Sequence, residues 1–297
     1  MQVSYISTVR IKIITDSTCN LSKDLVTKYD IEVIPAFVVI DDEEILDDGS
    51  IPPHVFYEKI DNSKRSMTSL STPKIIWDAI DKNKDYDHLL MIHVGGKLSG
   101  YIGAVTNVVK QYQKQNDKSP EITIYDSQGV SLLLGYLAIR AKQLADEGLG
   151  INEIVKQLDY MRENDLKVFM MVTTLKRIYA GGRISRATYL IGELLHAHPI
   201  LSIVDGKLIP IGKEFGFDRT IKKLIEFFQN SFEKDDEVLV SFPQTVPRER
   251  NDKFRKMIEK LKTPKITDIH DFYIGNIITC HTGTDVYGLI LARNFEL

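Results

Sequence analysis

The sequence predicts an α/β protein of two lobes, with a largely parallel sheet and crossover helices in the N-terminal lobe and a mixed sheet in an α+β C-terminal lobe. Short β-branched strands alternate with helical segments up to about residue 150, which is typical of a parallel sheet. From Leu166 the strands follow one another more closely, and Asp205-Gly206 suits the tight turn of a hairpin. We therefore place the lobes at 1–165 and 166–297.

In the N-terminal lobe, the expected strands are mostly apolar runs that end in a polar turn. We expect strands at 11–15, 31–39, 89–94 and 121–125, and a hairpin over 37–45. We expect helices at 21–28, 55–61, 73–81, 102–115 and 129–147, and another from Asn152. Thr72 suits the N-cap of the third of these helices, and Pro73 suits its first position.

The C-terminal lobe is predicted to mix strands and helices without regular alternation. Its expected strands lie at 168–173, 200–205, 207–211, 237–242 and 273–279, and its expected helices at about 218–232 and 248–261. The sequence contains no internal repeat and no low-complexity segment.

Composition excludes several classes of protein. Hydrophobic residues make up 43% and charged residues 27% of the 297 positions, as in globular proteins with a sizeable core. The net charge of −3 argues against general nucleic-acid binding, which needs a basic face. The first ten residues hold no apolar signal segment, and no run approaches the roughly 20 apolar residues of a membrane helix. Cys19 and Cys280 are isolated, so we expect free thiols in a cytoplasmic protein, with a disulfide as the alternative.

Common catalytic and metal-binding signatures are absent from the sequence, including G-x-S-x-G and H-E-x-x-H. Gly96-Lys97 is followed by leucine instead of Ser or Thr, so it is not a nucleotide-binding P-loop. His196 and His198 are two apart, which does not place them on one helix face. The acidic run 41–44 lacks the spacing of a calcium loop. We therefore expect no metal site, and a solvated hairpin turn at 41–44.

The most informative stretch is 89–104, where an apolar strand stops in a glycine-rich turn and a helix follows. The turn's N–H groups, the Ser99 hydroxyl and the positive end of the helix dipole converge on one place, which suits an anion. Similar turns, expected at strand ends, occur at 16–17, 68–69, 126–127, 181–185 and 281–283. Each turn alone is more simply a helix cap or a backbone bend. Together, without a nucleophile–base pair, they favour a site that binds an anion without attacking it.

Taken in order, the same segments resemble the DegV family of bacterial fatty-acid-binding proteins, which includes the FakB acyl carriers. The ordered set is specific, above all the Gly-Gly-Arg-Ile-Ser block that ends at Ser185. The matching segments are Thr15–Ser17, Thr68–Pro73, Leu98–Gly100, Asp126–Ser127, Leu175–Ser185, Pro199–Leu201, Gly206–Lys213 and His281–Gly288. They span about 11–293, and we expect a DegV-like domain over 11–294.

The resemblance implies a long-chain fatty acid, for example palmitate, with its acyl chain buried between or within two α/β lobes. It implies that hydroxyl groups hold the lipid carboxylate, with Thr68 and Ser99 as the carboxylate ligands. Gly100, His281 and Thr282 are the further members of the implied polar network. Bound fatty acid is then the ligand, with no other cofactor, no metal and no catalytic residue.

The chain departs from the family pattern at several positions. Tyr101 stands where the family usually has Thr, and it has no assigned role. Thr72 replaces the second Ser of the family's turn, and His198 replaces a common Lys before Pro199. Thr284-Asp285 replace the usual Pro-Gly, which places an added acid near the expected anion site.

In the acyl-carrier branch, the resemblance implies a fatty acid kinase as partner, which phosphorylates the bound carboxylate. The candidates for a partner surface are Arg177, Arg183 and Arg186, for which solvated charges are the alternative. The candidates for the tunnel lining, which core packing would also explain, are Ile102, Leu190, Leu194, Leu195 and Ile278.

The main hypothesis is a non-enzymatic lipid carrier with no nucleic-acid partner and no integral membrane association. One alternative is an enzyme acting on a small phosphorylated or carboxylated metabolite, with Ser99 or Ser127 taking part and His281 as base. The other alternative is a sensor whose lipid occupancy alters a protein contact.

Overall fold

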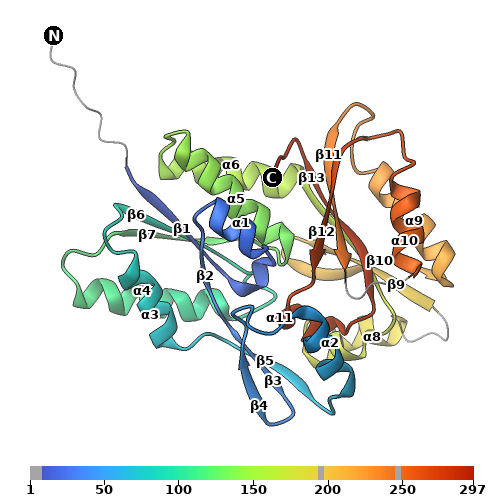
Figure 1. Cartoon of the computed structure of the whole chain (residues 1–297), viewed down its shortest axis with the longest axis horizontal. Helices are drawn as coiled ribbons and strands as arrows, with labels where there is room; N and C mark the ends of the chain where they lie inside the picture. Colours follow the sequence, from blue (N-terminus) through green and yellow to red (C-terminus); the bar gives the residue numbers. More distant parts are fainter. Residues whose placement is uncertain (1–8, 193–196, 245–248) are drawn as a thin grey trace.

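The computed structural model describes residues 9–192, 197–244 and 249–297. Two lobes lie side by side, each around its own sheet, and a small antiparallel sheet lies at one end of the N-terminal lobe (Figure 1). The predicted fold class is confirmed, because the N-terminal sheet is parallel and the C-terminal sheet is mixed. The chain changes from one sheet to the other at Leu166.

A parallel sheet in the order β2-β1-β6-β7 forms the N-terminal lobe. Its strands are β1 (Ile11–Asp16), β2 (Glu32–Ile34), β6 (His88–His93) and β7 (Glu121–Asp126). Every residue of β1 and β6 is buried, as expected for parallel strands covered on both faces. The polar turns that follow β1 and β6 therefore meet at one edge of the sheet, next to the C-terminal lobe.

Helices cover both faces of this sheet, α3 and α4 on one face and α5 and α6 on the other (Figure 1). The helices of this lobe are α1 (Lys23–Lys28), α2 (Pro53–Asn62), α3 (Pro73–Lys82), α4 (Tyr101–Gln115), α5 (Leu132–Asp146) and α6 (Ile151–Asn164). The Thr72 hydroxyl accepts a hydrogen bond from the Ile75 N–H, so the predicted cap of α3 is confirmed. The short 3-10 turn η1 (Ser17–Cys19) follows β1.

The small sheet corrects two predictions. It pairs β3 (Phe37–Ile40) with β4 (Glu43–Leu46) on one side and β5 (Ser66–Ser69) on the other. The single strand expected at 31–39 is wrong, because residues on the two sides of Pro35 belong to different sheets. The hydroxyl-rich turn expected at 68–69 is also wrong, since Thr68 lies on β5 opposite Val38. The hairpin around the exposed residues 41–44 is confirmed.

The C-terminal lobe holds a mixed sheet in the order β10-β9-β8-β13-β11-β12, in which β11 and β12 run parallel. Its strands are β8 (Leu166–Val172), β9 (Ala197–Val204), β10 (Lys207–Phe215), β11 (Glu237–Gln244), β12 (Lys265–Tyr273) and β13 (Val286–Arg293). Its helices are α7 (Lys176–Ala180), α8 (Arg186–Gly192), α9 (Phe217–Gln229), α10 (Glu249–Ile258) and α11 (Asn276–Thr282). Helices α9 and α10 lie on the side of the sheet away from the N-terminal lobe (Figure 1).

The strand predicted at 273–279 is wrong, because helix α11 occupies most of this segment. A short apolar run fits a buried strand and a buried helix equally well, so periodicity does not separate them. Gly275 precedes the helix and Gly283, with φ of 77°, ends it. Thus His281 lies in the last turn of a helix, not at a strand end.

The lobes share buried apolar residues, and both cysteines lie among them. Cys19 and Cys280 are buried free thiols, as predicted. Burial raises the pKa of each thiol to about 12. Within the residues that the structure describes, no helix has the length and apolar character needed to cross a membrane.

Candidate functional site

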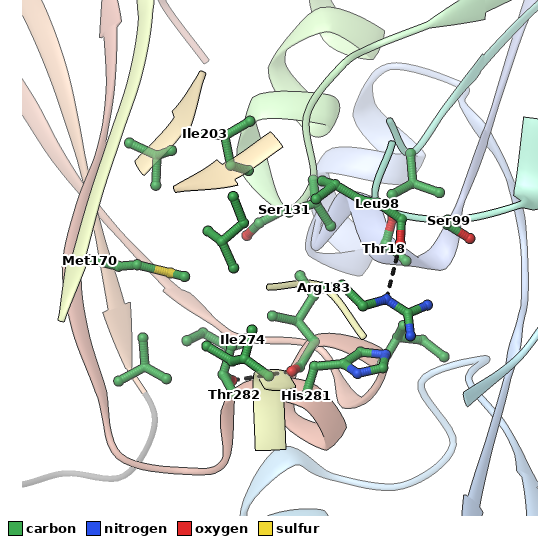
Figure 2. Close-up of a pocket in the computed structure, with 18 of the residues that line it drawn as sticks. Thr18, Leu98, Ser99, Ser131, Met170, Arg183, Ile203, Ile274, His281 and Thr282 are labelled. Atoms are coloured by element: carbon green, nitrogen blue, oxygen red, sulfur yellow. Dashed lines mark hydrogen bonds between the residues drawn. The ribbon is translucent and has the colours of Figure 1, made fainter. Parts of the chain in front are cut away.

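A cavity lies between the two lobes, and its walls are apolar apart from a few groups (Figure 2). β8, β9, β13 and α11 contribute one wall, and the turns after β1, β5, β6 and β7 contribute the other. It encloses about 1210 Å³ free of protein atoms, including the part open to solvent. Figure 2 shows Ser99, Arg183 and His281 on one side, opposite Met170 and Ile203.

Thr68 and His281 meet on the polar side. The Thr68 hydroxyl lies 3.1 Å from Nε2 of His281, which joins β5 to α11. Gly181 packs against the other edge of the imidazole, and a Cβ atom there would lie 2.5 Å from Nδ1. The first glycine of the Gly-Gly-Arg-Ile-Ser block is therefore needed for close approach to His281.

His281 is uncharged at neutral pH. Burial, with a smaller contribution from the nearby Arg183 guanidinium, lowers the pKa of His281 to about 4. A neutral imidazole offers one N–H donor and one acceptor, so it serves the site as a hydrogen-bonding group and not as a cation. Its low pKa also makes it a weak general base at neutral pH.

Arg183 supplies a positive charge to this side of the cavity. Its Nε donates to the carbonyl oxygen of Leu98 at 3.0 Å, which ties the loop after α7 to the turn that carries Ser99 (Figure 2). A second donor of Arg183 reaches the carbonyl of Gly181. Burial lowers the pKa of Arg183, and none of the carboxylates in the described part of the chain forms an ion pair with it. Among the described residues, this cation has no carboxylate partner, and it complements an anionic ligand.

The turn after β6 offers fewer free N–H groups than the sequence predicts. The N–H of Gly96 donates to the Asp126 carboxylate at 3.2 Å, and those of Leu98 and Ser99 donate to the Gly95 carbonyl. The Ser99 side chain lines the cavity. The N-cap residue Gly100 is exposed and lies outside the cavity lining. An anion here is therefore met by side chains more than by backbone amides.

Tyr101, which the sequence left unassigned, joins the start of α4 to the segment that follows β5. Its hydroxyl lies 2.7 Å from the Ser71 hydroxyl, which in turn donates to the Pro35 carbonyl. Its ring packs against His93, with centroids 5.0 Å apart. Ser71 follows β5 closely and Tyr101 is the first residue of α4. This hydrogen bond therefore fixes the position of Thr68 relative to Ser99.

The predicted lining residues have different positions. Ile278 lines the cavity, and so does Thr282, whose hydroxyl donates to the Ile278 carbonyl within α11. Ile102 does not line it, because it lies on the side of α4 near Gly96. Leu190 does not line it either, because its side chain on α8 is 60% exposed. Leu194 and Leu195 fall outside the described residues.

Two of the three arginines predicted for a partner surface are turned inward. Arg177 donates to the Ser66 hydroxyl at 2.8 Å and to the Ile60 carbonyl at 3.2 Å, so it fastens α7 to β5 and α2. Arg183 lines the cavity, and only Arg186 is exposed. The physical reason is that backbone carbonyls of neighbouring segments, Ile60 in α2 and Leu98 in the turn after β6, accept guanidinium donors of the two inward-facing residues.

Several polar residues of the cavity were missed by sequence reasoning. Thr18, Ser131 and Ser202 line it, and the signal for Thr18 was present in the polar turn after β1. Asp16 holds that turn, since its carboxylate accepts from the N–H of Thr18, the N–H of Val94 and, at 3.1 Å, faces Nδ1 of His93. In the residues described here, no group of three potential ligands is placed to hold a metal ion.

Comparison with known proteins supports the fold. The family model described as an uncharacterised protein of the DegV family matches residues 10–294. A DegV domain-containing protein of Clostridium acetobutylicum is 28% identical over 288 residues, which cover 96% of this chain and 99% of that protein. A DegV domain-containing protein of Staphylococcus aureus is 29% identical over 286 residues, which cover 95% and 98%.

Two solved structures extend the likeness to both lobes. A DegV family protein from Thermus thermophilus, described as binding fatty acid, is 25% identical with a TM-score of 0.86, and the match covers 96% of this chain and 99% of that one. DegV of Bacillus subtilis, described as a fatty acid binding protein, is 25% identical with a TM-score of 0.80, and the match covers 96% and 100%. Since the family model spans nearly the whole chain, this chain belongs to the DegV family.

Proposed function

We propose that this protein binds one long-chain fatty acid, with the acyl chain in the cavity between the lobes and the carboxylate on its polar side. The observation that carries the proposal is the asymmetry of the cavity: the Thr68 and Ser99 hydroxyls lie on one side with Arg183, which pairs with no carboxylate of the described residues, and the walls elsewhere are mostly apolar. The Thermus thermophilus and Bacillus subtilis relatives are described as fatty-acid-binding proteins, which supports it.

The hydroxyls of Thr68 and Ser99 are the proposed carboxylate ligands, with Arg183 as the nearby charge. A hydrogen bond from a hydroxyl to a carboxylate contributes roughly 1.5–3 kcal/mol net, so two contribute about 3–6 kcal/mol. His281 acts through Thr68 in the proposed arrangement: with the ring proton on Nε2, the imidazole donates to the Thr68 oxygen 3.1 Å away, which leaves the Thr68 hydroxyl proton for the ligand.

The acyl chain supplies most of the affinity. Burial contributes about 0.8 kcal/mol for each methylene, so a chain with roughly 14 methylenes gains about 11 kcal/mol before association costs. This exceeds the contribution of the hydroxyls. The polar side therefore orients the ligand and selects a free acid, while the apolar walls hold it.

The experiment that tests the proposal has two parts. Native mass spectrometry of the purified protein is expected to show a bound free fatty acid. The double variant Thr68→Val, Ser99→Ala is expected to weaken binding of palmitate by roughly 3–6 kcal/mol, measured by calorimetry on delipidated protein. Unchanged affinity in this variant, with its fold intact by circular dichroism, rejects the headgroup assignment.

We further propose that the protein is a non-enzymatic carrier that presents the bound acid to a fatty acid kinase. This role rests on the resemblance to the acyl-carrier branch of the family. The exposed Arg186 is the remaining candidate for a kinase contact among the three arginines, since the other two face inward. The test is phosphorylation of protein-bound palmitate by a purified bacterial fatty acid kinase, with Arg186→Gln expected to slow it.

The enzyme alternative gains no support from the geometry. With a pKa of about 4, His281 is a poor base for activating a serine at neutral pH. Ser127 lies outside the cavity, where its hydroxyl donates to the Gly129 carbonyl at 3.2 Å. A screen of small carboxylated and phosphorylated metabolites is therefore expected to show no turnover.

A further inference from the structure

A second cavity adjoins the far end of the first. It lies between α5, α6 and the end of α9, and its polar lining includes the side chains of Gln128, Arg162, Glu163, Lys167, Asp205 and Asn230. Four residues line both cavities: Val168, Phe169, Ser202 and Ile203. The two spaces are therefore separated by a wall that these four residues share.

The shared wall is a gap in the C-terminal sheet. Antiparallel strands β8 and β9 are paired at Met170 with Leu201 and at Met171 with Ile200, and no further pair is formed along their described residues. Continuing this register would bring Phe169 opposite Ser202 and Val168 opposite Ile203, the same four residues that line both cavities. The strands therefore lose their pairing at the wall between the two cavities.

A single side chain bridges this gap. The Ser202 hydroxyl donates to the Val168 carbonyl at 2.7 Å, in place of a backbone hydrogen bond between the strands. A side-chain bridge leaves more room than a backbone ladder, because the two main chains stand farther apart. The wall between the cavities is thus thin at Ser202, because the side chain of this residue is small.

Most of the second cavity's lining is apolar, and its charged side chains are those of Arg162, Lys167, Glu163 and Asp205. Arg162 is neutralised there by Asp159 at 2.8 Å and Glu163 at 3.1 Å. Lys167 is different, because its Nζ donates to the Glu163 carbonyl at 3.0 Å and no carboxylate of the described residues lies within ion-pair distance. Lys167 therefore keeps donors for an incoming hydroxyl or carboxylate.

We propose that the second cavity is a distal subsite, which takes the far end of a bound acyl chain when that end carries a polar group such as a hydroxyl or a carboxylate. This inference rests on the proposed function. A polar end group enclosed in an apolar pocket loses its hydrogen bonds to water and is strongly disfavoured. Passage between β8 and β9 places that group beside Lys167 instead, while the methylenes stay in the first cavity.

The first test compares hexadecanoic acid with 16-hydroxyhexadecanoic acid on delipidated protein, by competition for a fluorescent fatty acid. We expect the two dissociation constants to agree within about threefold. A closed apolar end would weaken binding of the hydroxy acid by about 30-fold or more. Loss of binding of both acids would reject the proposed function itself, whereas rejection of the hydroxy acid alone would reject only the distal subsite.

The second test fills the gap. Ser202→Leu is expected to raise the ratio of the two dissociation constants by about tenfold or more, whereas Ser202→Ala, which removes the bridge without filling the gap, does not raise it. Val168→Phe fills the same gap from β8, and it replaces Ser202→Leu in this comparison if Ser202→Leu does not fold. A ratio that stays at the wild-type value in a folded filling variant overturns the proposal.

The third test addresses Lys167 with hexadecanedioic acid. Lys167→Met is expected to weaken the diacid about tenfold relative to hexadecanoic acid, and Lys167→Arg to keep most of that preference. Equal weakening of the two acids by Lys167→Met would contradict a contact at the far end of the chain.

Discussion

The two sides of the cavity between the lobes are built differently. On the polar side, each group is held by a segment distant in sequence: Thr68 by His281, Arg183 by the Leu98 carbonyl, and Tyr101 by Ser71. On the far side, the strands that carry Met170 and Ile203 lose their pairing, and one serine bridges them. We infer that the recognition of the headgroup depends on fixed geometry, whereas the far end tolerates variation in the chain.

The largest expected effect is on pH dependence. The unfolded chain binds a proton at His281 near pH 6.5, but the folded protein does so only near pH 4, so the unfolded state holds more protons between these values. The resulting stability is present above pH 6.5 and is lost as pH falls toward 4. Delipidated wild type should lose up to about 3 kcal/mol more than His281→Gln over this range, measured by urea unfolding.

The comparison with a variant is necessary because a buried carboxyl group, that of Asp47, changes stability with pH in the opposite direction. Burial raises the pKa of Asp47 to about 6, so this group binds more protons in the folded state and gains stability as pH falls. Its contribution is common to wild type and variant and cancels in the difference. Parallel pH profiles of the two proteins would contradict the placement of His281 as a buried neutral group.

Arg183 should matter for affinity more than any exposed arginine. Arg183→Gln is expected to weaken fatty-acid binding by about 2 kcal/mol, because it removes a charge that complements the carboxylate. Arg186→Gln is the matched control, since Arg186 is exposed and should change the affinity by less than about 0.5 kcal/mol. Calorimetry with palmitate measures both, and equal effects would remove Arg183 from the headgroup site.

Gly181 tests how rigid the polar side is. Gly181→Ala places a Cβ atom 2.5 Å from Nδ1 of His281, so the ring or α7 must move. We expect a loss of about 1–2 kcal/mol in the free energy of unfolding, by urea titration. Gly103→Ala on α4 is the control, because a Cβ atom there meets no atom within 4 Å and Ala favours a helix. An unchanged free energy of unfolding in Gly181→Ala would show that the polar side accommodates the added methyl group without strain.

Tyr101 gives the smallest expected effect. Tyr101→Phe removes the hydrogen bond to Ser71 and is expected to weaken palmitate binding by about 1 kcal/mol, because Thr68 and Ser99 lose their common anchor. Tyr112→Phe, also on α4, removes a hydrogen bond to Asp81 away from the cavity. It should lower stability without lowering affinity, and a similar loss of affinity in both variants would argue against a positioning role for Tyr101.

The N-terminal sheet was predictable because its central strands are buried on both faces and appear as continuous apolar runs. Strand β5 was not, since Ser66–Ser69 has no apolar alternation and forms only because β3 supplies a partner. Helix α11 was mistaken for a strand because a short apolar run carries no reliable period. At both of these elements, which frame the site, tertiary contacts determine the structure and the local sequence pattern does not.

The candidate site was partly predictable in the same way. The resemblance supplied Thr68, Ser99 and His281, and the structure brings all three to one cavity. The inward direction of Arg177 and Arg183 was not predictable, because it depends on backbone carbonyl acceptors far away in sequence. Ile102 and Ile278 are the same residue type on two helices, and only the packing of these helices places Ile278, and not Ile102, in the cavity.

The burial of both native thiols has a practical consequence. The thiolate is the reactive form of cysteine, and with pKa values of about 12 Cys19 and Cys280 hold almost none of it at neutral pH. The sequence contains no other cysteine. A cysteine introduced at an exposed position such as Leu190 would therefore be labelled selectively by a maleimide dye in the otherwise native protein.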